Sequence, residues 1–240
     1  MKRWLRFTAA VLAAAFLFAL TGCGSSTNSA SFTWFVDSIP ANLDPQVASG
    51  ASDVIACENL YGTLVRKNPD GELVPGLCEK WTVSPDGLTY TFTLKDGLTY
   101  AAAKGAATEY DITAEDFVFA FRRIFRADTA SPYAVEFSAI QNSAAVQAGL
   151  ADESSLGVSA NGALTLVFRL SERDDNFLAK LALPGAAPCD EAFFESTRGT
   201  YGLTAKTTLA SGSFYLYNWT ANGLFLRRTV ESPLVGSLRL

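Results

Sequence analysis

Histidine is absent from the 240-residue chain, and its absence excludes much catalytic chemistry. Without it there is no Ser-His-Asp or Cys-His nucleophile arrangement, no histidine-ligated zinc and no near-neutral proton shuttle. Basic residues are also scarce, with 19 Lys and Arg against 24 Asp and Glu. This acidic balance disfavours nucleic-acid partners, which require a positive surface. The remaining composition, 49% hydrophobic and 18% charged, is typical of a globular protein.

The N-terminus combines three basic residues with a hydrophobic run. Lys2, Arg3 and Arg6 precede fourteen residues, 7–20, that are mostly Ala, Leu, Phe and Val. This pattern predicts a signal peptide over residues 1–22, with a run too short to span a bilayer as a mature helix. Its removal leaves 16 basic and 24 acidic residues, a net charge of −8.

The sequence that follows, Leu20-Thr21-Gly22-Cys23, resembles a bacterial lipobox. The resemblance implies cleavage before Cys23, a diacylglycerol on its thiol and a flexible tether over residues 23–30. The alternative is an ordinary signal peptide followed by a chance cysteine. We therefore expect an extracytoplasmic protein anchored to the bacterial cell membrane by an N-terminal lipid.

Three further cysteines, Cys57, Cys78 and Cys189, are widely spaced and form no CxxC pair. Their spacing supports no disulfide, and each has apolar or helical neighbours, so we predict small buried thiols. No metal site or cofactor is predicted.

Local patterns predict a mixture of strands and helices. A strand with aromatic residues on both faces is expected over 31–37, buried on both sides. Pro-Asp-Gly turns predict two hairpins over 64–74 and 80–94, and Asn-Gly pairs predict two more around 161–162 and 222–223. Helices are expected from Thr113, where a threonine cap and two acids begin an apolar stripe, and over about 134–150.

A set of motifs in order along the chain resembles the peptide-binding class of extracellular solute-binding proteins, the oligopeptide and dipeptide receptors of ABC importers. The motifs are Leu43-Asp44-Pro45, Leu60-Tyr61-Gly62-Thr63-Leu64-Val65, Pro75-Gly76-Leu77-Cys78-Glu79-Lys80-Trp81, Asp86-Gly87-Leu88-Thr89-Tyr90-Thr91-Phe92-Thr93-Leu94, Thr113-Ala114-Glu115-Asp116-Phe117, Thr129-Ala130-Ser131-Pro132-Tyr133 and Gly212-Ser213-Phe214-Tyr215. Each motif is weak alone, but the set covers nearly all of residues 31–230.

The resemblance implies an α/β fold, a periplasmic-binding-protein-like (type II) lobe with a mixed sheet. Residues 31–60 and 190–240 would form part of the main lobe, and residues 61–189 a smaller hairpin and helix subdomain. Family members continue into a second lobe that closes over the ligand, so the chain resembles the first half of such a receptor. We expect its open edge to expose apolar residues around Leu224, Phe225 and Leu234.

The same resemblance implies a ligand site. Ser49, Gly50 and Ala51 would pair their backbone N–H and C=O groups with a bound peptide, and Tyr133 would line the pocket. The alternatives are an ordinary glycine-containing loop and a core tyrosine. The terminal-charge contacts of a peptide belong in this family to the second lobe, so no residue is assigned to them.

The leading hypothesis is a non-catalytic receptor that delivers peptides to ABC permease subunits. Within this family nickel, haem or oligosaccharide ligands are equally compatible with the sequence. Two other classes remain open: a secreted lipoprotein hydrolase using a carboxylate pair or a Ser-Lys site, and a receptor remnant that binds nothing.

Overall fold

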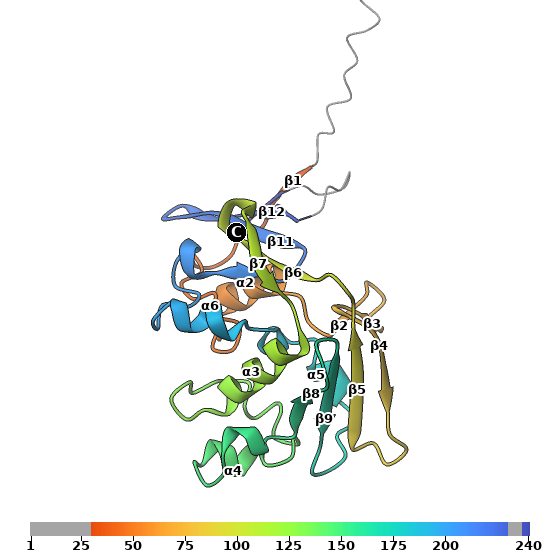
Figure 1. Ribbon diagram of the computed structural model, residues 1–240. Coiled ribbons are helices and arrows are strands. Elements are labelled where there is room, and N and C mark those ends of the chain that lie inside the picture. Colours follow the sequence, from red (N-terminus) through yellow and green to blue (C-terminus); the bar gives the residue numbers. More distant parts are fainter. Residues whose placement is uncertain (1–29, 230–236) are drawn as a thin grey trace, which may run out of the picture.

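The computed structural model of the protein describes residues 30–229 and 237–240, and Figure 1 shows how they are arranged. The helices are α2 (Ala51–Leu60), α3 (Ala114–Phe125), α4 (Ser143–Gln147), α5 (Phe177–Lys180) and α6 (Glu191–Ser196). The strands are β1 (Ser31–Thr33), β2 (Val65–Lys67), β3 (Leu73–Pro75), β4 (Cys78–Val83), β5 (Thr89–Leu94), β6 (Thr99–Ala102), β7 (Ala107–Asp111), β8 (Val158–Ala160), β9 (Thr165–Arg169), β10 (Leu209–Ala210), β11 (Phe214–Thr220), β12 (Gly223–Arg228) and β13 (Ser237–Arg239).

Antiparallel hairpins form where turn residues predicted them. Strands β2 and β3 pair with each other, and β4, β5, β9 and β8 form a four-stranded sheet in that order. Gly71 and Gly87 close their turns with φ values of 83° and 75°, a region that glycine enters without steric cost. All four predicted hairpins are confirmed, including β11–β12.

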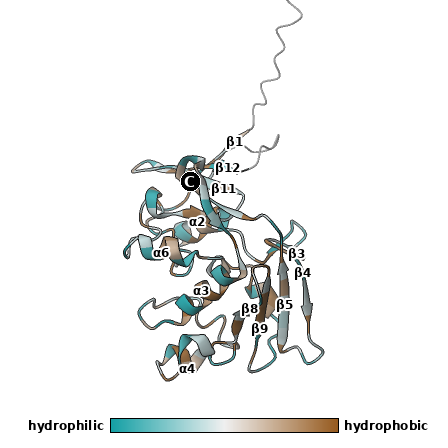
Figure 2. Cartoon of the chain, in the orientation of Figure 1, coloured by the Kyte–Doolittle hydropathy of each residue, from teal (hydrophilic) through white to brown (hydrophobic). Residues whose placement is uncertain are grey.

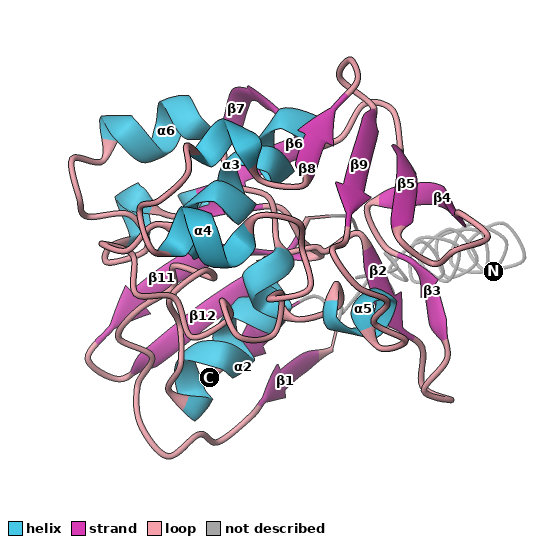
Figure 3. Ribbon diagram, turned by 90° about the horizontal axis from the view of Figure 1, so that it is seen from below, coloured by secondary structure: helices cyan, strands magenta, loops and turns pink. Residues whose placement is uncertain are grey.

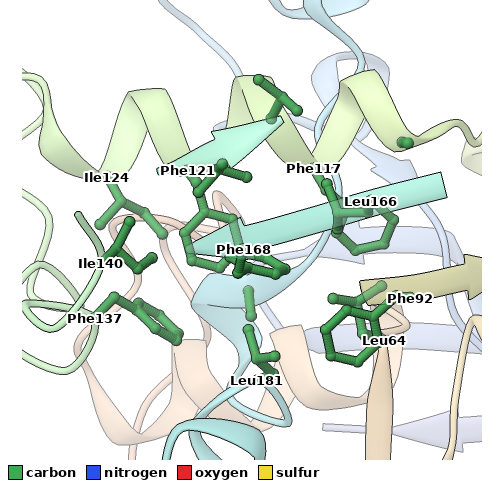
Figure 4. Packing of buried hydrophobic residues seen from close by; sticks show 14 of the residues in the cluster. Leu64, Phe92, Phe117, Phe121, Ile124, Phe137, Ile140, Leu166, Phe168 and Leu181 are labelled. Atoms are coloured by element: carbon green, nitrogen blue, oxygen red, sulfur yellow. The ribbon is translucent and has the colours of Figure 1, made fainter. Parts of the chain in front are cut away.

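Helix α3 begins as its sequence predicts. The Thr113 N–H donates to Asp116 Oδ2 at 2.8 Å. In return, the Thr113 side chain accepts from the Asp116 N–H, which completes a capping box. The apolar stripe of α3 packs against β8 and β9. Figure 4 shows Phe117 and Phe121 pointing from this helix toward Phe168 and Leu166. These residues belong to the larger of two main hydrophobic cores.

The second core lies beneath another sheet, whose strand order is β1-β13-β12-β11. Leu43, Leu60, Leu216 and Leu226 are among its buried residues, so α2 and the preceding loop cover this sheet. Figure 3 shows β11 and β12 with α2 on one side of the molecule, and β4, β5, β8 and β9 on the other. A three-stranded sheet, β10-β6-β7, contributes to both cores, since Leu209 belongs to the larger core and the next residue, Ala210, to the second.

Two sequence expectations about exposure are wrong, and so is one about the helix over 134–150. The strand at residue 31 is not buried on both sides: β1 is an exposed edge strand whose one partner among the described residues is β13. Leu224 is fully buried and Phe225 partly buried, while Leu234 lies outside the described residues. The exposed aromatic residues at this end of the sheet are instead Phe32 in β1 and Trp34 and Phe35 just after it.

The predicted helix over 134–150 is reduced to α4. Asn142, just before α4, adopts a left-handed φ of 64°, and Ile140 forms a bridge to Leu170 beside the four-stranded sheet. Tertiary pairing therefore overrides the helical pattern at this point. Figure 2 shows hydrophobic and hydrophilic residues interleaved along the helices, and within residues 30–229 and 237–240 every helix is too short or too polar to cross a membrane.

Candidate functional site

The segment Ser49–Ala51 presents free backbone groups at the surface. All three residues are exposed, and Gly50 precedes α2 in an extended conformation, φ −67° and ψ 140°. The Gly50 carbonyl accepts a hydrogen bond from the Val54 N–H at 2.9 Å. Among the described residues, the N–H and C=O of Ser49 and the N–H of Gly50 have no hydrogen-bond partner. An extended, unpaired and exposed backbone can pair with another extended chain.

Tyr133 packs tightly against a glycine. Its side chain is 8% exposed, and a Cβ added at Gly185 would lie 2.4 Å from the Tyr133 Cγ, so only glycine fits there. Burial, with smaller contributions from Cys57 and Glu58, raises the pKa of Tyr133 to about 12. The hydroxyl group therefore stays protonated at neutral pH and can donate a hydrogen bond. Because little of Tyr133 is exposed, its contact with a ligand stays a prediction.

A groove of about 1170 Å³ is lined neither by Ser49–Ala51 nor by Tyr133. Its walls come from α2, β2, β6 and β11, and include Glu58, Arg66 and Lys95. The Lys95 ammonium donates to the Gly76 carbonyl at 2.5 Å. The elements around the groove are far apart in the sequence, so no local pattern indicated it.

A buried ion pair that the sequence analysis missed lies directly before the Ser49–Ala51 segment. Arg123 Nη2 lies 2.5 Å from Asp44 Oδ2, and Arg123 Nη1 donates to Gln46 Oε1 at 2.6 Å. The guanidinium also lies 4.0 Å from the ring centroid of Phe194, a cation–π arrangement. The available signal was an arginine beside the apolar stripe of α3, together with the aspartate of the Leu-Asp-Pro motif.

The three internal cysteines are free and buried, as predicted. Burial raises the pKa of each thiol, that of Cys189 to about 12. Because the thiolate is the reactive form, none of the three is activated as a nucleophile. Among the described residues no group of three His, Cys, Asp or Glu side chains could hold a metal ion. Cys23 lies outside the described residues.

The mixed sheets, the packing of α2 against one of them and the core around α3 define an α/β fold of the periplasmic-binding-protein type. The chain belongs to the bacterial extracellular solute-binding proteins, family 5, whose middle region matches residues 72–228. The resemblance seen in the sequence motifs is thereby confirmed.

Several relatives have been named for what they bind. The chain is 36% identical over 135 residues to the periplasmic murein peptide-binding protein MppA of Escherichia coli, covering 55% of this chain and 24% of that protein. It is 28% identical over 223 residues to the oligopeptide-binding protein AliA of Streptococcus pneumoniae, covering 92% of this chain and 33% of that protein.

Solved structures show the same relationship. The substrate-binding domain of an oligopeptide ABC transporter from Bacillus anthracis superimposes with a TM-score of 0.79 at 27% identity, covering 87% of this chain and 40% of that one. The 240 residues thus span about a quarter to a third of these curated relatives and about two fifths of this solved structure.

Proposed function

We propose that the protein is the substrate-binding component of an ABC importer and that it captures peptides through their backbone. The observation that carries this proposal is the exposed backbone at Ser49 and the extended Gly50, where both groups of Ser49 and the Gly50 N–H have no partner among the described residues, in a chain of solute-binding family 5. Relatives named as oligopeptide- and murein peptide-binding proteins support a peptide as the ligand.

Backbone pairing explains how such a site would accept many sequences. Every peptide carries the same alternating N–H and C=O groups, so a ligand strand beside Ser49–Ala51 forms hydrogen bonds that do not depend on its side chains. Gly50 has no side chain, which lets that strand approach closely. The protonated hydroxyl of Tyr133 adds a donor beside the ligand.

The finer parts of the proposal concern location and partners. A lipid on Cys23, joined through residues 23–30, would hold the protein at the outer face of the cell membrane. There it would deliver peptide to ABC permease subunits. The relatives' names support an extracytoplasmic location, since MppA is called periplasmic.

Nuclear magnetic resonance titration of the purified chain with tetra-alanine tests this function. Because the chain spans only part of its relatives, we expect weak binding, with a dissociation constant on the order of 0.1–1 mM. Amide resonances of Ser49, Gly50 and Ala51 should shift, along with ring resonances of Tyr133.

The matched control is tetra-alanine with N-methylated amides, which cannot donate backbone hydrogen bonds. Its carbonyls can still accept from the Ser49 and Gly50 N–H groups, but it cannot donate to the Ser49 carbonyl and its methyl groups obstruct close approach, so it should shift the same resonances less. If tetra-alanine at several millimolar moves none of them, or if the methylated peptide moves them equally, backbone capture at this segment is wrong.

A further inference from the structure

Gln46 stands where three separate parts of the chain meet. Its side chain is fully buried, and Arg123 Nη1 donates to its Oε1 at 2.6 Å. Its Nε2 donates to two carbonyls, that of Gly185 at 3.2 Å and that of Ala187 at 3.0 Å. The amide thus uses both donors and its acceptor, and an apolar side chain here would leave two buried carbonyls without these donors.

The backbone of Gln46 is tied into the same network. Ser131 Oγ donates to the Gln46 carbonyl at 2.5 Å and accepts from the Tyr133 N–H at 3.2 Å. Gly185, whose carbonyl Gln46 binds, lies against the Tyr133 ring. Gln46 is therefore linked to Tyr133 twice, through Ser131 to its backbone and through Gly185 to its ring.

The same residue lies in a hydrogen-bonded turn that leads to α2. The Gln46 N–H donates to Asp44 Oδ1 at 3.1 Å, and the N–H groups of Val47 and Ala48 donate to the Asp44 carbonyl at 3.1 and 2.9 Å. Asp44 is itself held by Arg123. The turn so fixed runs directly into Ser49–Ala51, three residues beyond Gln46.

We propose that Gln46, held by Arg123, is a positioning residue that sets the Ser49–Ala51 backbone and the Tyr133 ring in one fixed arrangement for a peptide ligand. The inference rests on the proposed function for its ligand, but the coupling between the two segments is a property of the fold itself. A buried ion pair is weak evidence for stability, whereas a buried amide with all its hydrogen bonds made fixes geometry. The Gln46 amide is satisfied in this way, although the Nε of its partner Arg123 has no hydrogen-bond partner among the described residues.

Two variants test the proposal. Ser131→Ala removes one hydroxyl and retains the ion pair, and Gln46→Met removes the whole side-chain amide at similar volume. The matched control is Ser143→Ala, which removes another partly buried hydroxyl that donates to a backbone carbonyl, that of Ser138 at 2.7 Å. Amide hydrogen exchange, urea unfolding and tetra-alanine titration are measured on the full chain.

We expect amide exchange to accelerate on both sides of the network together. Exchange of the Ala48 and Ala134 amides, which lie on the two sides of the network, should accelerate about tenfold or more in Gln46→Met, and tetra-alanine binding should weaken at least fivefold. Ser131→Ala should show the same changes in smaller size, with an unfolding midpoint equal to that of Ser143→Ala.

Two outcomes overturn the inference: acceleration at only one of the two amides, or equal effects in Ser143→Ala. If Gln46→Met does not fold, Ser131→Ala alone decides between these results. If the unchanged chain shows no peptide-induced shifts, the proposed function fails, and the exchange measurements still decide whether Gln46 couples the two segments.

Discussion

The two main cores of the molecule differ in how completely they are covered. In the larger core, Phe121 lies 4.9 Å, centroid to centroid, from both Phe137 and Phe168, and all three rings are fully buried. In the second core the sheet ends at β1, where Phe32 is 53% exposed, and Phe35, two residues beyond the strand, is 91% exposed. The first core is closed by its own residues, and the second leaves aromatic surface at its edge.

This difference separates what each region can do alone. A closed aromatic core is a source of stability for the described residues, whereas an exposed aromatic edge strand is a surface for association. The candidate ligand segment, Ser49–Ala51, belongs to the less completely covered region. Binding and association are thus both expected on the side of the molecule around β1 and α2.

Phe121→Ala is the variant expected to change stability most. Removing a fully buried ring leaves a cavity between α3 and β9, which lowers the free energy of unfolding by about 3–5 kcal/mol. Urea unfolding followed by tryptophan fluorescence measures this as a lower midpoint at unchanged slope.

Phe35→Ala is the matched control in the other region. The same truncation at an exposed ring should change the free energy of unfolding by less than about 0.5 kcal/mol. Equal losses from the two variants would show that β1 is covered in solution and would break the comparison.

The next effect concerns a carboxyl group enclosed by the larger core. Burial raises the pKa of Asp116 to about 7, against the opposing effect of the Thr113 N–H. The folded state therefore holds more protons than the unfolded state between about pH 4 and 7, and the free energy of unfolding falls as pH rises through that window. The loss is on the order of 1–3 kcal/mol.

Asp116→Asn keeps an acceptor for the Thr113 N–H and removes the titrating group. Urea unfolding at pH 4.5, 5.5 and 7 should show a smaller decline than in the unchanged chain. Glu115→Gln, one residue earlier and exposed, is the control and should keep the full decline. The same pH dependence in all three proteins would contradict the effect of burial.

Local sequence predicted the elements whose geometry is set locally. The turns at Gly71 and Gly87 and the cap at Thr113 depend on residues within four positions, and all three formed as expected. The aromatic residues from Phe32 onward predict a strand in the interior, but burial depends on what packs against a strand, and within the part of the chain that the structure describes β13 is the one strand that pairs with β1.

The candidate site was harder to predict for the same reason. Arg123 and Asp44 are 79 residues apart, and Gln46 reaches carbonyls about 140 residues away. No periodicity or spacing encodes such pairings. The segment Ser49–Ala51 was found only through resemblance, since a glycine-containing loop carries no chemical signal of its own.

Phe35→Ser is the variant expected to change folding least, and it tests most directly whether the exposed residues at and just after β1 cause association. We expect the unchanged chain to self-associate as concentration rises, because Phe32 in the edge strand β1 and Trp34 and Phe35 just after it are exposed aromatic residues. Replacing the most exposed ring should reduce association, measured by light scattering over a concentration series, and leave the unfolding midpoint unchanged. Leu150→Ser, at a similarly exposed apolar residue far from β1 in the sequence, should leave the association unchanged. If light scattering shows a monodisperse monomer of the unchanged chain at high concentration, the residues around β1 do not promote association. The two cores would then differ in exposure alone.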